Sequence, residues 1–213
     1  MINEVLRVVI GISVALLINR RMPSKEKEFI EDRRKIEEDM IFLLKQYAIY
    51  LKSDQSMDDR IPQALNDLKQ AVESGLDHAT VFANNELSDT SEYYLKYISM
   101  RQSEVMILQD IYAVLALITR TDPAVIPLAE YIEVLAKCVS VQQPLSPAGS
   151  AQQKLHKVLE SEDLPATKEQ LTDRMAIFYI SESLEQMISV KLEFMTAITE
   201  EEKKRYWQNY ENS

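Results

Sequence analysis

The sequence predicts an all-α protein: a bundle of three long helices and several short ones, preceded by an apolar, membrane-associated N-terminal helix. Only 3 of the 213 residues are glycine and 7 are proline, too few turn signals for a sandwich of many short strands. Hydrophobic residues make up 46% of the chain, which is enough to build a sizeable core. In the long segments between the prolines, apolar residues recur every three or four positions, as they do on one face of a helix.

The composition also excludes several classes of function. The single cysteine, Cys138, rules out an intramolecular disulfide framework and a cysteine-rich zinc site. The three glycines are too far apart to form a phosphate-binding loop. The net charge of −10 argues against a nucleic-acid partner, because nucleic-acid binding normally needs a basic face. We therefore expect no catalytic residues, no metal site and no cofactor.

The N-terminal helix is predicted from residues 8–18, which contain no charged side chain. Extended back to Ile2, the segment would rise about 25 Å as a helix, against a hydrocarbon core of about 30 Å, so the sequence leaves open whether it spans the bilayer. A basic cluster follows it, formed by Arg20, Arg21, Lys25 and Lys27. Such a cluster marks the cytoplasmic end of a membrane helix, so we expect the bulk of the chain on the cytoplasmic side of the cell membrane. A cleaved signal peptide fits less well, because no A-x-A-like site follows.

The first two bundle helices are predicted as follows. Pro23 ends the N-terminal helix and Ser24 caps the next one, which runs to about Lys52. The apolar stripe of this helix consists of Phe29, Ile36, Met40, Leu43, Tyr47 and Leu51. A shorter helix is expected over residues 61–74, with Gly75 as its C-terminal stop.

The remaining helices include two more long ones. The first covers about residues 92–119, and its stripe consists of Tyr94, Ile98, Val105, Leu108, Tyr112, Leu115 and Ile118. Short helices are expected over residues 127–141 and 151–161. Thr167 and Gln170 have capping-box spacing and open the last long helix. Its expected inner face consists of Leu171, Met175, Phe178, Leu184, Ile188, Leu192 and Met195.

Three segments of the sequence resemble one known family. Residues 11–29 (GISVALLINRRMPSKEKEF) resemble the last transmembrane segment and exit of the Gram-positive aromatic acid exporter family. Residues 91–109 and 164–194 resemble helices of that family's cytoplasmic C-terminal domain. Members of the family carry several transmembrane helices before this junction, and this chain has at most one. The resemblance therefore implies a cytoplasmic domain (residues 23–198) that follows the end of a last membrane helix (residues 1–22) and precedes a charged, aromatic tail (residues 199–213).

One group of side chains suggests ligand binding. Tyr94, Tyr97 and Arg101 are spaced by three and four residues and share a helix face. If that face is exposed, two aromatic rings and a guanidinium could hold an aromatic carboxylate. The structural alternative is that Tyr94 belongs to the core and Arg101 pairs with Glu104 or with acids of a neighbouring helix. The basic and aromatic tail (residues 199–213) also has two interpretations. It could lie at a membrane interface, or it could pack on the bundle.

The sequence favours a non-catalytic cytoplasmic domain of an aromatic acid exporter-like membrane protein, with a regulatory or assembly role and no transport by itself. Its expected partners are the membrane, through the N-terminal helix, and transmembrane subunits or further copies of itself. A soluble helical interaction module with a buried first helix is the alternative. A metal-dependent bundle enzyme is a second alternative, which rests on the i,i+3 glutamate pairs Glu130/Glu133 and Glu182/Glu185.

Overall fold

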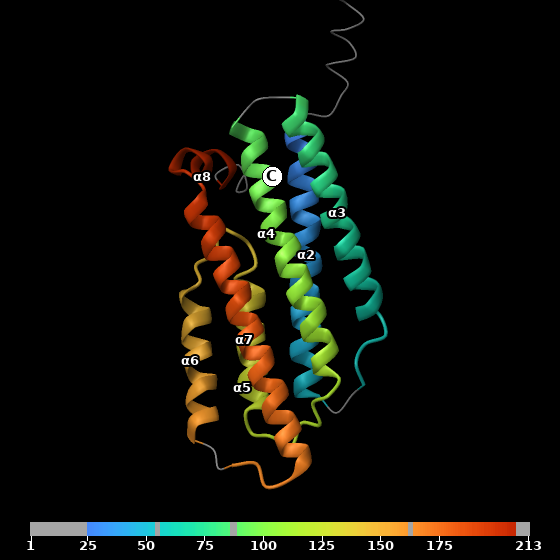
Figure 1. The fold of residues 1–213 in the computed structure, drawn as a ribbon, viewed down its shortest axis with the longest axis vertical. Helices are drawn as coiled ribbons and strands as arrows, with labels where there is room; N and C mark the ends of the chain where they lie inside the picture. The colour runs from blue at the N-terminus through green and yellow to red at the C-terminus, as the bar shows by residue number, and fades with distance from the viewer. Residues whose placement is uncertain (1–24, 54–55, 86–88, 162–163, 208–213) are drawn as a thin grey trace, which may run out of the picture.

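The computed structural model of the protein describes residues 25–53, 56–85, 89–161 and 164–207. In this part of the chain every regular element is a helix and no strand is present, so the predicted all-α fold is confirmed. The helices (Figure 1) are α2 (Lys25–Lys52), α3 (Ile61–Asn85), α4 (Asp89–Leu115), α5 (Val125–Lys137), α6 (Ser146–Ser161), α7 (Lys168–Ala197) and α8 (Glu200–Trp207).

The predicted membrane helix over residues 1–22 lies outside the described residues. So do Arg20, Arg21 and the side chains of Lys25 and Lys27. None of the helices that the structure describes is long and apolar enough to cross a bilayer. Attachment to the membrane and the cytoplasmic orientation therefore stay predictions.

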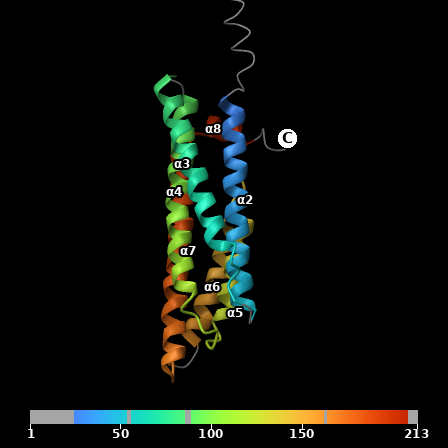
Figure 2. The ribbon, with the colours of Figure 1, turned by 90° about the vertical axis from the view of Figure 1, so that its right-hand side faces the viewer.

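The long helices run up and down the bundle, as Figures 1 and 2 show. Helix α2 packs against α3 and α5, α4 packs against α3 and α7, and α6 packs against the outer side of α5. Helix α5 has 13 residues and is about 20 Å long, whereas α2 has 28 residues and is about 42 Å long. The carboxyl end of α5 therefore lies about halfway along the bundle and not at one of its ends.

The apolar stripe predicted for α2 is confirmed, because all six of its side chains are buried in the core. The stripe predicted for residues 92–119 is also buried, except that Tyr112 is only partly covered. The predicted cap of α7 is present: Thr167 Oγ1 accepts a hydrogen bond from the backbone N–H of Gln170 at 3.2 Å. The side chain of Gln170 in turn accepts from the backbone N–H of Ala166 at 3.0 Å. Local sequence patterns therefore specify these elements correctly.

The predicted end of the second bundle helix at Gly75 is wrong. Helix α3 continues through Gly75 to Asn85 and becomes a fourth long helix of the bundle. A Cβ atom at Gly75 would lie 2.9 Å from Cδ1 of Ile98 on α4. A side chain at this position would require the end of the Ile98 side chain to shift, so the glycine favours the close approach of α3 and α4, a packing role that the sequence of α3 alone does not reveal.

The inner face predicted for α7 is wrong for most of its residues. Leu184 is buried and Ile188 and Met195 are partly buried, but Leu171, Met175, Phe178 and Leu192 are exposed. The buried face of α7 consists instead of Asp173, Ala176, Ile177, Ile180, Ser181, Ser183, Leu184, Met187, Lys191 and Phe194. Two of these, Asp173 and Lys191, bind backbone groups of other segments. Apolar residues have helical spacing on both faces of α7, and the buried face also carries Asp173 and Lys191. Apolar spacing alone therefore did not distinguish the two faces, and the polar contacts of Asp173 and Lys191 favour the one that turns inward.

The C-terminal tail packs on the bundle. Tyr206 of α8 is buried, and its ring stacks on Tyr93 of α4 with centroids 4.2 Å apart. The carbonyl of Trp207 accepts a hydrogen bond from the side chain of Gln142 at 2.7 Å. Of the two interpretations of the tail, packing on the bundle is confirmed for the residues up to Trp207.

The corrected orientation of α7 predicts unequal effects for two leucines of the same helix. Leu184→Ala should lower the free energy of unfolding by about 2–5 kcal/mol, because it leaves a cavity in the core. Leu192→Ala should change it by less than about 1 kcal/mol, because that side chain is already half-exposed. Denaturant unfolding measures both, and equal losses would contradict this assignment of the faces.

Candidate functional site

The centre of the bundle contains a network of buried charges around Arg101 of α4. The guanidinium donates to Glu104 Oε2 at 2.6 Å, to Glu37 Oε1 of α2 at 2.9 Å and to the carbonyl of Val139 at 2.9 Å. It also donates through Nε to the hydroxyl of Tyr97 at 3.0 Å. Arg101 has no exposed surface, so its charge is compensated entirely by protein groups.

The two carboxylates of this network differ in their surroundings. Burial raises the pKa of Glu37, but the nearby guanidinium groups of Arg101 and Arg33 outweigh it and hold that pKa below its ordinary value. Glu37 also accepts from the Tyr97 hydroxyl at 3.1 Å and from Arg33 at 3.2 Å. Burial raises the pKa of Glu104, and the attraction of Arg101 offsets only part of that effect. Glu37 is therefore the better stabilised anion of the two.

Lys191 of α7 adds a third buried cation beside Arg33 and Arg101. Its ammonium group donates to the carbonyls of Cys138 at 2.5 Å and Ser140 at 2.7 Å. Burial and the positive charge of Arg101 lower the pKa of Lys191 to about 8. The cations of the network outnumber its two carboxylates, and backbone carbonyls provide the remaining acceptors.

These carbonyls belong to the residues that directly follow α5, which ends at Lys137. Cys138 and Val139 are buried and Ser140 is partly buried. Buried polar groups without partners are costly, so these carbonyls need donors from the protein. Arg101 and Lys191 provide the donors for Val139, Cys138 and Ser140. The network therefore connects α2, α4 and α7 to the segment that follows α5.

A second polar cluster surrounds Asp173 near the start of α7. Its carboxylate accepts from the backbone N–H groups of Thr119 at 2.5 Å, Thr121 at 2.7 Å and Asp122 at 3.3 Å, and from both threonine hydroxyls at 3.1 Å. Arg120 lies within this turn with a φ of 65°, a left-handed conformation that disfavours a side chain. Asp173 thus holds a strained turn between α4 and α5. Burial raises its pKa, but the hydrogen bonds from Thr119 and Thr121 outweigh burial and lower it.

The structure separates the three residues of the predicted ligand site. Tyr97 and Arg101 lie in the charge network, whereas Tyr94 lines a cavity of about 160 Å³ between α2, α3 and α4. The expectation of an exposed helix face is wrong, because all three side chains are buried. The structural alternative is confirmed, since Arg101 pairs with Glu104 and with Glu37 of a neighbouring helix. Binding of an aromatic carboxylate by these residues stays a prediction.

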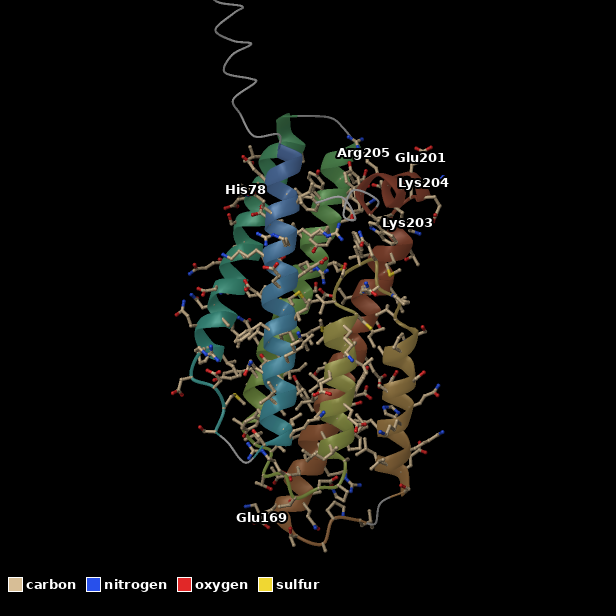
Figure 3. The ribbon with its side chains drawn as sticks, turned by 180° about the vertical axis from the view of Figure 1, so that it is seen from behind. His78, Glu169, Glu201, Lys203, Lys204 and Arg205 are labelled. Carbon is tan, nitrogen blue, oxygen red and sulfur yellow. The ribbon has the colours of Figure 1, made fainter. Side chains whose placement is uncertain are left out.

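The cavity beside Tyr94 has chemistry unlike that of a carboxylate site. Its wall includes the ring of Phe29, which stacks on Tyr94 with centroids 3.7 Å apart. The other lining groups include Glu28, Asp32 and Asp77. His78, labelled on α3 in Figure 3, pairs with Asp32 at 3.0 Å. The three carboxylates would repel an anionic ligand.

Three of the four glutamates that suggested a metal site contact basic side chains. Glu130 pairs with Lys154, Glu133 pairs with Lys52, and Glu185 lies 3.1 Å from Nε2 of His156. In the part of the chain that the structure describes, His, Cys, Asp and Glu residues form no group of three or more that could hold a metal ion.

Sequence reasoning missed Glu37, Asp173 and Lys191 as members of the two clusters. A weak signal was present for Asp173 and Lys191. Both lie in α7 among residues with core spacing, at positions 173, 177, 180, 184 and 191. A charged residue in register with an apolar face needs a buried partner, but the sequence cannot name that partner.

Comparison with known proteins identifies the family. A sequence model described as "Putative aromatic acid exporter C-terminal domain" matches residues 26–192, which is most of the chain. The chain belongs to this family. The resemblance to aromatic acid exporters that the sequence suggested is thus confirmed, and both polar clusters lie within the matched region of this aromatic acid exporter C-terminal domain.

Two relatives match most of the chain, and one of them is a longer protein. "Uncharacterized protein YqjA" of Bacillus subtilis (strain 168) is 25% identical over 192 residues, which cover 90% of this chain. The match spans 59% of the length of that relative. A Clostridium difficile 630 protein, whose crystal structure is described as that of a "putative membrane protein", matches with a TM-score of 0.69 and 16% identity. The match covers 80% of this chain and 98% of the other, and at this identity it shows a shared fold.

The charge network predicts that Arg101 is needed for folding. Arg101→Gln should lower the free energy of unfolding by about 3–5 kcal/mol, because it leaves Glu37 and Glu104 buried without their main cation. Arg34→Gln is the matched control, since Arg34 forms a helix ion pair with Glu38 at 3.3 Å that is largely exposed. The control should change stability by less than about 0.5 kcal/mol. Chemical denaturation followed by circular dichroism compares the two variants, and equal stabilities would contradict the role of the network.

The lowered pKa of Asp173 predicts a pH-dependent contribution to stability. Because the folded-state pKa is below the unfolded-state value, the contribution is complete above about pH 4 and is lost as the pH falls through the folded pKa. Asp173→Asn should therefore cost about 2–4 kcal/mol at pH 7, and the difference from wild type should shrink below about pH 4. Urea unfolding of both proteins from about pH 2 to about pH 7 measures this difference in the free energy of unfolding. Asp110→Asn, at an exposed position of α4, serves as the control and should show a small difference throughout.

Proposed function

We propose that this chain is the non-catalytic cytoplasmic domain of an aromatic acid exporter-like membrane protein, attached to the membrane by residues 1–22. In this proposal the domain assembles or regulates a membrane partner and does not transport substrate by itself. Family membership over residues 26–192 supports the exporter context. The relative from Clostridium difficile 630, described as a "putative membrane protein", has the same fold, which is consistent with this setting.

The observation that carries the proposal is the position at which α2 begins. Helix α2 starts at one end of the bundle, and its first turn contains Lys25 and Lys27 of the basic cluster that follows the apolar segment. Figure 3 shows that α8, with the labelled side chains of Glu201, Lys203, Lys204 and Arg205, lies at this same end. A membrane helix over residues 1–22 would therefore place this end of the bundle next to the lipid headgroups, where basic side chains are favoured.

The interior of the domain supports an assembly role over catalysis. Buried ionisable groups that are poised for chemistry usually line a cleft. Here Arg101, Glu37 and Glu104 bind one another and backbone groups at the centre of the bundle. Lys191 likewise donates to carbonyls that follow α5. These charges hold helices together, which is what a domain that presents a rigid surface to a partner requires.

Cell fractionation tests the proposal. The full chain should sediment with membranes, and removal of residues 1–22 should release a folded domain into the soluble fraction, because helices α2 to α8 form a continuous core among themselves. Cooperative thermal unfolding of the released domain is the control for folding. A full chain found in the soluble fraction, or a truncated chain that fails to fold, would favour the soluble module with a buried first helix. A reporter fused after Ser213 should be active on the cytoplasmic side.

A further inference from the structure

Helix α7 turns large apolar side chains outward along its first half. Leu171 is 49% exposed, Met175 is 65% exposed and Phe178 is 58% exposed, and Tyr179 lies beside them. We call these four residues the α7 patch. On the opposite, buried face of the same helix lie Asp173 and Lys191, two side chains that would normally be hydrated. A helix with charges inside and aromatic and aliphatic groups outside is the arrangement expected when a further protein surface covers the outer face.

A groove runs beside the α7 patch. It has a volume of about 540 Å³ and is lined by His156, Leu159, Glu160, Arg174, Met175 and Phe178. It forms because α6 packs against α5 and leaves space between itself and α7. The groove gives the patch a concave edge that can receive apolar side chains of a partner.

The position of the patch favours a protein occupant over the membrane. The patch lies near the start of α7, and Figure 3 shows Glu169 at this end of the molecule, opposite α8. Helix α2 begins at the α8 end (Figure 2), about 40 Å away along the bundle. In the attachment proposed above, the lipid headgroups would also lie at the α8 end, far from the patch. This location favours another protein surface as the occupant.

The charges around the patch match those of a second copy. Lys168 and Glu182 are both exposed, and they lie seven residues before and seven residues after Met175. Seven residues are two helical turns, so both side chains lie on the same outward face as Met175. If two α7 helices pack antiparallel with a two-fold axis at Met175, Lys168 of each copy lies opposite Glu182 of the other. The same axis brings Leu171 of one copy to Phe178 of the other.

We propose that two copies of this chain associate through the α7 patch, as an antiparallel pair of α7 helices related by a two-fold axis at Met175. Such an interface is isologous, so it closes at a dimer and doubles each favourable contact. The proposal deepens the assembly role proposed above by naming the partner as a second copy. Membrane retention does not depend on this contact, so the fractionation and dimer experiments can fail separately.

Cysteine cross-linking of the full chain tests the geometry. In a Cys138→Ser background, Met175→Cys should form a disulfide-linked dimer under mild oxidation, because a two-fold axis brings the two copies of this residue together. Ile49→Cys is the matched control, since Ile49 is 50% exposed on α2. At the same protein concentration, the Met175→Cys variant should give at least about tenfold more dimer than the control. Equal yields from the two variants would overturn the proposal.

Sedimentation equilibrium of the full chain, in detergent if it is membrane-bound, tests the energetics. Phe178→Asp should raise the dissociation constant of the dimer at least about tenfold, and Ile49→Asp should leave it nearly unchanged. Lys168→Glu should also weaken the dimer, and the double variant Lys168→Glu with Glu182→Lys should restore it. Circular dichroism checks that each variant is folded. A wild-type chain that remains monomeric at about 100 μM, or a dimer insensitive to these changes, would overturn the proposal.

Discussion

The structure depends on the contacts that α7 makes with two chain reversals. The turn between α4 and α5 lies at one end of the bundle, with Thr119 and Thr121 exposed and Asp122 buried, whereas Cys138 and Val139 of the segment after α5 are buried inside it. Asp173 accepts hydrogen bonds from the N–H groups of the first, and Lys191 donates to the carbonyls of the second. An unpaired buried backbone group costs about as much as a lost hydrogen bond, so these contacts determine where α5 can begin and end.

The same constraint explains the charge network. Because α5 ends halfway along the bundle, the buried carbonyls that follow it require donors, and Arg101 and Lys191 provide them. Buried cations in turn require anions, which are Glu37 and Glu104. A buried ion pair seldom adds stability over a well-packed apolar core, but it strongly penalises arrangements that separate its members. The network therefore specifies the relative positions of α2, α4 and α7 more than it strengthens the bundle.

The orientation of α7 has a functional consequence. Because Asp173 and Lys191 must face inward, Met175 and Phe178 are directed outward at the end of the bundle that is remote from the start of α2. In the proposals made above, one end of the domain serves for attachment and a separate surface contacts a partner. The Bacillus relative, of which the match spans 59%, is a longer protein.

Sequence patterns determined the elements whose signals are local. The apolar stripe of α2 and the capping box at Thr167 follow from helical spacing and backbone chemistry within a few residues, and both are present in the structure. Only the tertiary structure decided the roles of Gly75, Arg101 and the residues of α7. The local signal at Gly75 predicted the end of a helix, but in the structure α3 continues through this residue, which lies close to Ile98 of α4. Two partners of Arg101 are distant in the sequence, namely Val139 at 38 residues and Glu37 at 64 residues. Spacing along one helix predicts which side chains share a face, but whether that face turns inward depends on polar partners from other segments, which only folding brings together.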